Sequence, residues 1–348
     1  MLKDDLTYFS KTNDKTRFML TAEISCIYKK NDKVRKVHNV IFAPDFESVK
    51  NIQNKLSKIG SITSDGRPIL GFDAKDLLDI ILNVDEECFL IPAHIWTPWF
   101  STLGSKSGFD SIDECFEELT SHIFAIETGL SSDPAMNWRC SFLDKFSITS
   151  NSDAHSPENL GREANIFDTD LSYYSIKNAL KNNDDEFIGT FEFFPQEGKY
   201  HYDGHRKCGI LWDPVESIKH NFICPECGKP VTLGVMHRVN ELADREDVDN
   251  YPNKKPYHSI IPLKEILSEI LKSGKNSKKV QNKFFNLIDK FGSELDILIN
   301  TPIDLLEKDN PLLGEGIRKM REGNVIIKEG FDGEYGKITL FDKNELDE

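Results

Sequence analysis

The segment FSITSNSDAH, residues 146–155, places a short apolar stretch directly before an aspartate and a histidine. Phe146–Ser150 is rich in aromatic and β-branched residues, which predicts a β-strand. Asp153 and His155 follow it two residues apart, so in an extended backbone their side chains point to the same side. The segment therefore predicts a strand that presents two ligand-type side chains at its C-terminal end.

Four other apolar segments are predicted strands, and helical segments alternate with them. The predicted strands are Arg17–Ala22, Val34–Phe42, Cys88–Ala93 and His122–Ile126. The predicted helices are Asp45–Ile59, Ala74–Leu82 and Ser111–Thr120. Alternating strands and helices indicate an α/β fold with a largely parallel sheet, either open or closed into a barrel.

Most of the predicted strands contain, or are followed by, a carboxylate or imidazole side chain. These residues are Glu23, His38, His94, Glu127, Asp153 and His155. Loops from several strands converge at the C-terminal edge of an α/β sheet, where rigid strands hold functional side chains in place. A core histidine or a helix-capping aspartate is the simpler explanation for any one of them, but the joint pattern favours a metal site.

The residue types at this candidate site indicate its metals and its chemistry. Mixed imidazole and carboxylate ligands suit zinc, manganese or iron better than calcium, and the expected cofactors are divalent Zn, Mn, Fe or Mg. The expected reaction is metal-assisted hydrolysis, in which bound cations acidify a water and screen a phosphate or carbonyl oxygen. The expected catalytic residues are His94, Glu127, Asp153 and His155.

A second group of metal-binding residue types lies later in the chain. His205-x-x-Cys208 is followed, after fifteen intervening residues, by Cys224-Pro-Glu-Cys227-Gly. Two short ligand pairs joined by a loop have the spacing of a zinc knuckle or ribbon. Four protein ligands leave no open coordination position, so this zinc is predicted to be structural.

The other histidines and cysteines leave some choices open. His201 or His220 could replace His205 as the fourth zinc ligand. The cysteines without ligand spacing, predicted to be core residues, are Cys26, Cys88, Cys115 and Cys140. Seven cysteines do not make a closed disulfide framework, so a reducing compartment is expected.

Changes in composition along the chain predict three parts. Residues 1–195 are the predicted phosphoesterase domain, residues 196–245 the zinc-binding module, and residues 246–348 a mainly helical region with an acidic tail. In the last part the expected elements are helices at 262–271, 278–291 and 303–306 and a strand at 337–341.

Two segments are candidate contacts for DNA. Trp96, Trp99 and Phe100 follow a candidate ligand and are expected to stack on an extruded base, or alternatively to line the barrel mouth without any ligand. Lys106 lies in a loop of glycine and serine that is similar to a phosphate-facing loop, although these residues also simply form turns.

The other candidate contact is the basic segment 272–290, which holds six lysines and one aspartate. Lys278 and Lys279 belong to it, and such a segment can follow a phosphate backbone. The alternative is the solvated face of a helix whose apolar side, with Phe284 and Phe285, packs in the core.

The 348-residue chain has a formal net charge of −15, which disfavours indiscriminate attraction to nucleic acid or to an anionic membrane. Binding to DNA therefore requires a local basic surface. The sequence has no apolar run of about 18 residues and no signal-peptide core at its start. No membrane partner is expected, and a cytoplasmic location is predicted.

Long stretches of the chain resemble the endonuclease Q family. They are IPAHIWTPWFSTLGSKSGFDS (91–111), ETGLSSDPAMNWR (127–139), SNSDAHSPENLGREAN (150–165), DGHRKCGI (203–210) and CPECGKPVTLGVMHRVNELADR (224–245). The resemblance implies a polymerase-and-histidinol-phosphatase (PHP) domain with a distorted seven-stranded barrel, a zinc module and a C-terminal region.

The resemblance also implies a DNA repair endonuclease. Such an enzyme nicks DNA on the 5′ side of a deaminated base, such as uracil, hypoxanthine or xanthine, or of an abasic site. The metal ligands carried over by motif are Glu23, His38, His94, Glu127, Asp153 and His155. The zinc module would be held by Cys208, Cys224 and Cys227, with His205 as their partner.

The sequence departs from the family pattern near its start. PHP proteins open with a His-x-His strand, and this sequence contains no His-x-His. The chain is therefore expected to be N-terminally incomplete. It is either a fragment or mis-started reading frame of a normal enzyme, or a truncated protein with a damaged metal site. In this form it is expected to be poorly active. Two other functions stay open: a catalytically dead protein that binds lesion DNA, and a phosphoesterase for a small phosphorylated metabolite.

Overall fold

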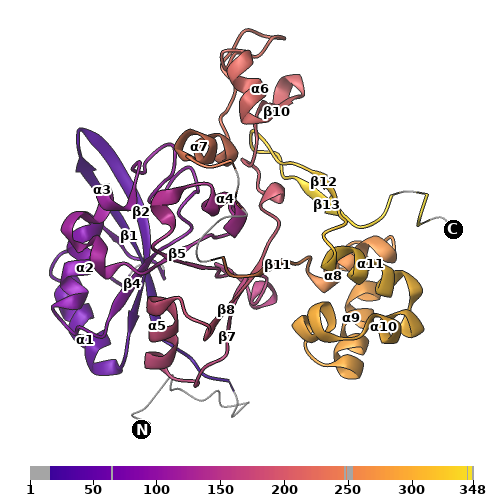
Figure 1. Cartoon of the computed structure of the whole chain (residues 1–348), viewed down its shortest axis with the longest axis horizontal. Coiled ribbons are helices and arrows are strands. Elements are labelled where there is room, and N and C mark those ends of the chain that lie inside the picture. Colours follow the sequence, from indigo (N-terminus) through magenta and orange to yellow (C-terminus); the bar gives the residue numbers. More distant parts are fainter. Residues whose placement is uncertain (1–15, 64–65, 247, 249–253, 343, 347–348) are drawn as a thin grey trace. The chain divides into compact units, whose positions relative to one another are not determined.

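The computed structural model describes residues 16–63, 66–246, 248, 254–342 and 344–346 (Figure 1). The chain forms two compact units. Unit 1 consists of residues 1–150, 165–189 and 235–256, and unit 2 consists of residues 151–164, 190–234 and 257–348. Each unit therefore combines segments that are distant in sequence. The three-part division at residues 195 and 245 follows sequence order and stays a prediction.

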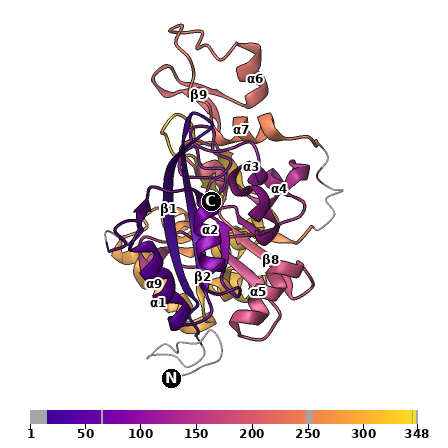
Figure 2. The same cartoon turned by 90° about the vertical axis from the view of Figure 1, so that its left-hand side faces the viewer.

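A long β-hairpin crosses unit 1 (Figure 2). Its strands, β1 (Leu20–Lys30) and β2 (Lys33–Ala43), pair in antiparallel orientation along their whole length. Between them, Asn31 and Asp32 have φ angles of 53° and 57°. A two-residue type I′ turn requires this left-handed conformation at both positions, and Asn and Asp tolerate it better than other residues with side chains. The turn therefore fixes the register of the two strands.

Two further strands complete a four-stranded sheet in the order β3–β1–β2–β4. β3 (Ile69–Leu70) runs parallel to β1, whereas β4 (Phe89–Pro92) runs antiparallel to β2. The expected largely parallel arrangement is wrong for this sheet, because a two-residue turn returns the chain directly beside β1 without a crossover helix. α1 (Phe46–Leu56) and α2 (Ala74–Leu82) lie on the same side of the sheet (Figure 1).

The remaining elements of unit 1 are short. β5 (Ala125–Glu127) and β6 (Ser147–Thr149) form a parallel pair. β7 (Ala164–Phe167) neighbours β8 (Phe187–Glu192), the strand in which the chain passes into unit 2. The helices are α3 (Ile112–Phe116), α4 (Pro134–Trp138), α5 (Tyr173–Asn182) and α7 (Val235–Leu242), with 3-10 turns at Glu117–His122 and Ser141–Leu143.

The α/β class is confirmed, but the closed seven-stranded barrel is not. The described strands are divided among five hydrogen-bonded sheets of two to four strands. The first strand also differs from its prediction, which ended at Ala22, because β1 continues to Lys30. The buried side chains of Ile24, Cys26 and Tyr28 alternate along this extension and hold it against the core.

Unit 2 contains short strands and a group of helices. The strands are β9 (Asp203–His205), β10 (Ile210–Trp212), β11 (Tyr257–Ser259), β12 (Ile326–Lys328) and β13 (Lys337–Thr339). The helices are α6 (Pro214–Lys219), α8 (Leu263–Ile270), α9 (Lys278–Phe291), α10 (Ile303–Asp309) and α11 (Pro311–Arg321), with a π-helical turn at Asp296–Asn300 and 3-10 turns at Pro157–Asn159, Pro195–Glu197 and Arg206–Cys208. β9 pairs with β10 and β12 with β13, both antiparallel, and β11 runs parallel to the end of β8.

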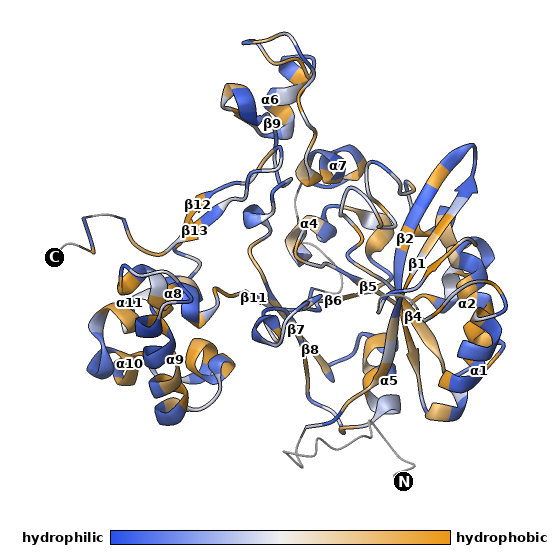
Figure 3. Ribbon diagram, turned by 180° about the vertical axis from the view of Figure 1, so that it is seen from behind, coloured by the Kyte–Doolittle hydropathy of each residue, from blue (hydrophilic) through white to orange (hydrophobic). Residues whose placement is uncertain are grey.

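Helices α8–α11 enclose one apolar core. Figure 3 shows polar and apolar residues interleaved along them, as expected for helices with one buried face. Fully buried members of this core include Leu263, Leu306, Leu313 and Ile317. The predicted helical C-terminal region is therefore present, ending in the β12–β13 hairpin. Among the described residues, none of the helices has both the length and the apolar composition to cross a bilayer.

Candidate metal centres

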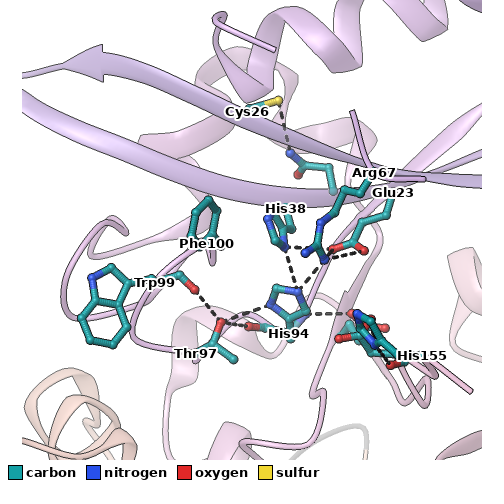
Figure 4. Close-up of polar contacts among 12 residues, drawn as sticks. Glu23, Cys26, His38, Arg67, His94, Thr97, Trp99, Phe100 and His155 are labelled. Atoms are coloured by element: carbon teal, nitrogen blue, oxygen red, sulfur yellow. Dashed lines mark hydrogen bonds and ion pairs between the residues drawn. The ribbon is translucent and has the colours of Figure 1, made fainter. Parts of the chain in front are cut away.

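Three of the predicted ligands meet in unit 1. Nδ1 of His38 lies 2.9 Å from Oε1 of Glu23 and 3.2 Å from Nε2 of His94. Nε2 of His94 lies 3.4 Å from the same Glu23 oxygen. Figure 4 shows the three side chains converging. We call Glu23, His38 and His94 the His–Glu cluster.

The register of the β1–β2 hairpin brings Glu23 and His38 together. Glu23 pairs with Val40, and Ser25 pairs with His38. Glu23 and His38 are therefore diagonal neighbours on one face of the sheet, at a spacing of about 7–8 Å that long side chains can span. Glu23 was predicted to follow the end of a strand. This position is wrong, because Glu23 lies inside β1, but the predicted ligands His38 and His94 do lie beside it.

His94 is held by contacts on three sides. It follows β4 with a φ of 30°, an uncommon value for a residue with a side chain. Its backbone N–H donates to Oε2 of Glu127 at 2.8 Å, and its Nδ1 lies 3.2 Å from Oγ1 of Thr97. Gly129, with a φ of 59°, packs so closely that a Cβ atom there would overlap Cβ of His94. These contacts leave Nε2 directed at the other two cluster residues.

The electrostatics of the cluster favour cation binding. Burial acts to raise the pKa of Glu23, but hydrogen bonds with His38 and His94, and the charge that these rings carry when protonated at acidic pH, outweigh it and hold the pKa well below its ordinary value. Burial lowers the pKa of His38 in spite of its hydrogen bond to Glu23. At neutral pH the pair therefore presents a carboxylate and a neutral imidazole, which are the metal-binding forms.

The spacing of the three ligand atoms fits a divalent ion. Tetrahedral coordination at about 2.0–2.1 Å separates neighbouring ligand atoms by roughly 3.3 Å, and the observed separations run from 2.9 to 3.4 Å. One ion can therefore be bound without a rearrangement of the strands. Three protein ligands leave a coordination position for water or substrate, as in catalytic sites.

In the described part of the chain, this compact group of ligand atoms does not include the other three predicted ligands. Glu127 is buried and accepts the N–H of His94. Asp153 and His155 belong to unit 2, where the His155 side chain is 76% exposed and its Nδ1 lies 2.8 Å from the carbonyl oxygen of Asp153. Their assignment as metal ligands stays a prediction.

A second group of ligand atoms lies in unit 2 and is formed by the four predicted zinc ligands. His205, Cys208, Cys224 and Cys227, here called the Cys–His cluster, place one ligand atom each within 4.8 Å of the others. Nδ1 of His205 lies 3.5 Å from Sγ of Cys227. The local turn is closed by Gly228, whose N–H donates to the carbonyl of Cys224 at 2.9 Å.

The turn also affects the chemistry of its first cysteine. Desolvation acts to raise the pKa of Cys224, but backbone N–H groups of Cys227 and Glu226 and a hydrogen bond with His205 lower it to about 7. The thiolate is the form that binds zinc. The structure therefore presents a four-ligand set that suits zinc, with no open position.

The two alternative histidines lie elsewhere in unit 2. His201 is buried and its ring stacks on Tyr202. His220 stacks on Trp212 with ring centroids 4.4 Å apart. The structure therefore favours His205 as the fourth member.

The predicted aromatic contacts for DNA have different environments. Trp96 is fully buried, and its Nε1 donates to Oδ1 of Asn137 at 2.8 Å. The prediction that Trp96 stacks on an extruded base is wrong, because its indole belongs to the core. Trp99 is 44% exposed, and the Phe100 ring packs on His38 with centroids 4.8 Å apart. These two residues stay candidates (Figure 4).

The predicted lysine contacts are on the surface. Lys106, Lys278 and Lys279 are exposed. Two other lysines of the basic segment 272–290 form ion pairs with Asp309 at 2.6 and 2.8 Å. Part of the positive charge of this segment is therefore neutralised within unit 2, and its binding to DNA stays a prediction.

Sequence reasoning did not identify Arg67. Its Nη1 donates to both carboxylate oxygens of Glu23, at 3.1 and 3.0 Å. The N–H of Ser25 donates to the carbonyl of Pro68 at 2.9 Å, which holds the chain before β3 beside β1. This pairing joins segments far apart in sequence, and no local pattern around Arg67 indicates it.

Two curated relatives cover much of the chain. The MJ0043 protein of Methanocaldococcus jannaschii, an uncharacterized protein, is 36% identical over 253 residues, which are 70% of this chain and 31% of that protein. The chain thus spans about a third of MJ0043. The uncharacterized protein YqxK of Bacillus subtilis is 31% identical over 314 residues, 87% of this chain and 73% of YqxK. Residues 262–324 match the family model of the MJ0043 C-terminal domain.

Two solved structures share the fold. The lesion-specific endonuclease PfuEndoQ of Pyrococcus furiosus has a TM-score of 0.83 and 29% identity, over 94% of this chain and 79% of that one. An endonuclease Q in complex with a 27-mer duplex, which carries an abasic lesion at the active site, has a TM-score of 0.82 and 28% identity over 97% and 82%. The fold and the two clusters thus define an α/β protein with the architecture of a DNA endonuclease. The chain belongs to the endonuclease Q family.

Proposed function

We propose that this chain is a metal-dependent DNA endonuclease of DNA repair. It nicks on the 5′ side of a deaminated base, such as uracil, hypoxanthine or xanthine, or of an abasic site. The His–Glu cluster carries the proposal, because it is a three-ligand site in a chain of the endonuclease Q family. The complex with an abasic lesion supports damaged DNA as the substrate class.

The His–Glu cluster would hold a divalent metal through Oε1 of Glu23, Nδ1 of His38 and Nε2 of His94. A metal bound there acidifies a water and screens the charge on a phosphate. Thr97 contacts Nδ1 of His94 and so orients the ring with Nε2 toward the cluster. We propose that the further ligands are Glu127, Asp153 and His155.

The Cys–His cluster would bind one structural zinc. Its four ligands leave no position for substrate, so the zinc would stabilise the fold of this part of unit 2. None of the seven cysteines forms a disulfide. Cysteines without disulfides fit the predicted reducing, cytoplasmic location, which stays a prediction.

The test is an assay of nicking on a labelled duplex that carries one uracil, hypoxanthine or abasic site. With Mn²⁺, Mg²⁺ or Zn²⁺ we expect one cut on the 5′ side of the lesion, and no cut in EDTA. An undamaged duplex of the same sequence is the substrate control. Cutting in EDTA, equal cutting of the undamaged duplex, or no cutting with any of these metals would contradict the proposal.

Variants assign the reaction to the site. His94→Ala and Asp153→Asn are expected to lower the nicking rate about a hundredfold or more, with unchanged circular dichroism, because each loses a ligand. Glu158→Gln is the matched control, since Glu158 is an exposed carboxylate close to Asp153 in sequence that pairs with Lys264 at 3.5 Å. A wild-type rate for Asp153→Asn would remove that residue from the site.

A further inference from the structure

We propose that Arg67 binds a phosphate oxygen of the DNA strand at the His–Glu cluster. The inference rests on the proposed function, since it names the cation with which this site would hold its substrate.

The guanidinium of Arg67 is only partly used by its contact with Glu23. Both hydrogen bonds to the carboxylate come from Nη1, whereas an arginine that clamps a carboxylate presents two nitrogens to the two oxygens. Nε and Nη2 donate to no other residue in the described part of the chain, and the side chain is 36% exposed. These nitrogens form a planar fork beside the cluster, which matches the geometry of phosphate oxygens.

The guanidinium of Arg67 brings positive charge directly to the cluster. Its Nη1 pairs with Glu23 at 3.0 Å, and a divalent ion held by the cluster would place further positive charge beside it. A phosphate oxygen between the two would be attracted by both. The nearby cations Arg35 and Lys36 lie over the rings of Phe109 and Phe100 instead.

The position of Arg67 is fixed by the sheet. β3 begins two residues later and pairs with β1, and the N–H of Ser25 donates to the carbonyl of Pro68. Figure 4 shows the guanidinium of Arg67 beside Glu23 and facing His94. A phosphate bound by Arg67 would therefore lie next to the ligand atoms of the cluster, where the scissile bond has to be.

The first test measures binding of the full chain to a uracil-containing duplex between 50 and 200 mM salt. Arg67→Gln is expected to weaken binding about fivefold to tenfold and to reduce the slope of log K against log salt by about 0.9, which is the loss of one phosphate contact. Arg67→Lys keeps the charge and is expected to keep the slope. Arg318→Gln is the matched control, because Arg318 also pairs with carboxylates, Glu307 and Glu315, but on the helices of unit 2.

The second test separates phosphate binding from support of Glu23. If Arg67 only positions Glu23, Arg67→Gln raises the Mn²⁺ concentration needed for half-maximal nicking, and saturating Mn²⁺ restores the wild-type rate. The slope of log K against log salt is then unchanged. This pair of results overturns the inference. If Arg67 binds phosphate, nicking stays at least tenfold slower at saturating Mn²⁺. If Arg67→Gln does not fold, Arg67→Met, which also removes the charge, is measured in the same way, and a wild-type rate at saturating Mn²⁺ overturns the inference.

The two proposals fail in different ways. If the wild-type chain nicks no lesion duplex with any metal, the proposed function fails. The binding experiment still decides on Arg67, since a reduced salt slope supports the contact and an unchanged slope overturns it.

Discussion

Replacement of Glu197 by glutamine is expected to stabilise unit 2 at pH 8 but hardly at pH 5. Burial and, to a smaller extent, the Glu265 carboxylate raise the pKa of Glu197 to about 7, although Lys275 acts to lower it. An acid with a raised pKa binds its proton more tightly in the folded chain, so stability is lost as the pH rises from about 4.5 toward 7. A shift of about 2.5 pK units corresponds to about 3 kcal/mol. Glu197 is half-buried, and solvent screening reduces the expected effect to about 2 kcal/mol.

The assay is urea unfolding followed by circular dichroism at pH 5 and pH 8, at one ionic strength. Glutamine cannot ionise, so Glu197→Gln should exceed the wild type by about 2 kcal/mol in free energy of unfolding at pH 8 and by about 0.5 kcal/mol at pH 5. Glu322→Gln is the matched control, because Glu322 is an exposed carboxylate of the same unit, and its free energy of unfolding should stay within about 0.5 kcal/mol of the wild type. An equal advantage of Glu197→Gln at both pH values would refute the reasoning.

Three other substitutions test the two clusters. Cys224→Ser removes a thiolate from the Cys–His cluster and should lower the zinc content of purified protein from one ion to none, with a lower melting temperature; a zinc-replete variant of equal stability would contradict the structural assignment. Gly129→Ala should cost about 1–3 kcal/mol in thermal unfolding and weaken Mn²⁺ binding, since the new Cβ overlaps His94 in a left-handed backbone. Gly161→Ala is the control, because Gly161 also has a left-handed backbone but a Cβ atom there would meet no other atom; it should leave Mn²⁺ binding unchanged. Unchanged Mn²⁺ binding for Gly129→Ala would argue against the contact between residue 129 and His94. Asp332→Ala removes the acceptor for the Arg206 N–H at 2.7 Å and for the Thr232 hydroxyl at 2.6 Å. Transfer of zinc from the Cys–His cluster to a chelator should therefore be faster. An unchanged half-time of this transfer would show that the two hydrogen bonds do not support the cluster.

The elements that sequence predicted best have a strong helical period. α2 and α9 begin and end at the predicted residues, because apolar residues recur on one face along their full length. α11 was not predicted, since Gly314 and Gly316 lower helix propensity. In the structure the backbone of Glu307 lies too close to Gly314 for a larger residue, and the side chains of Leu340 and Phe341 pack tightly on Gly316, so tertiary packing outweighs propensity.

The two clusters differ in how far sequence could predict them. The Cys–His cluster depends on two short ligand pairs, whose spacing is visible in the sequence and is present in the structure. For the metal site in unit 1, six side chains within or after predicted strands were selected, and three of them, Glu23, His38 and His94, meet in the structure. The rule did not foresee that β1 continues past Glu23, nor that β3 brings Arg67 beside it, because both depend on pairing between distant segments.

The His–Glu cluster depends on two strand registers rather than on strand ends. A slip of one residue between β1 and β2 would turn His38 to the opposite face of the sheet, away from Glu23. The Asn31–Asp32 turn prevents this slip, and the bond from the Ala93 N–H to the His38 carbonyl, at 3.0 Å, holds the chain before His94 beside β2. Backbone hydrogen bonds thus bring these ligand atoms together before a metal binds. The Cys–His cluster has three of its ligands in tight turns, so a zinc ion bound there would couple metal binding to folding. A chelator should therefore unfold the second cluster's surroundings but leave the β1–β2 hairpin intact.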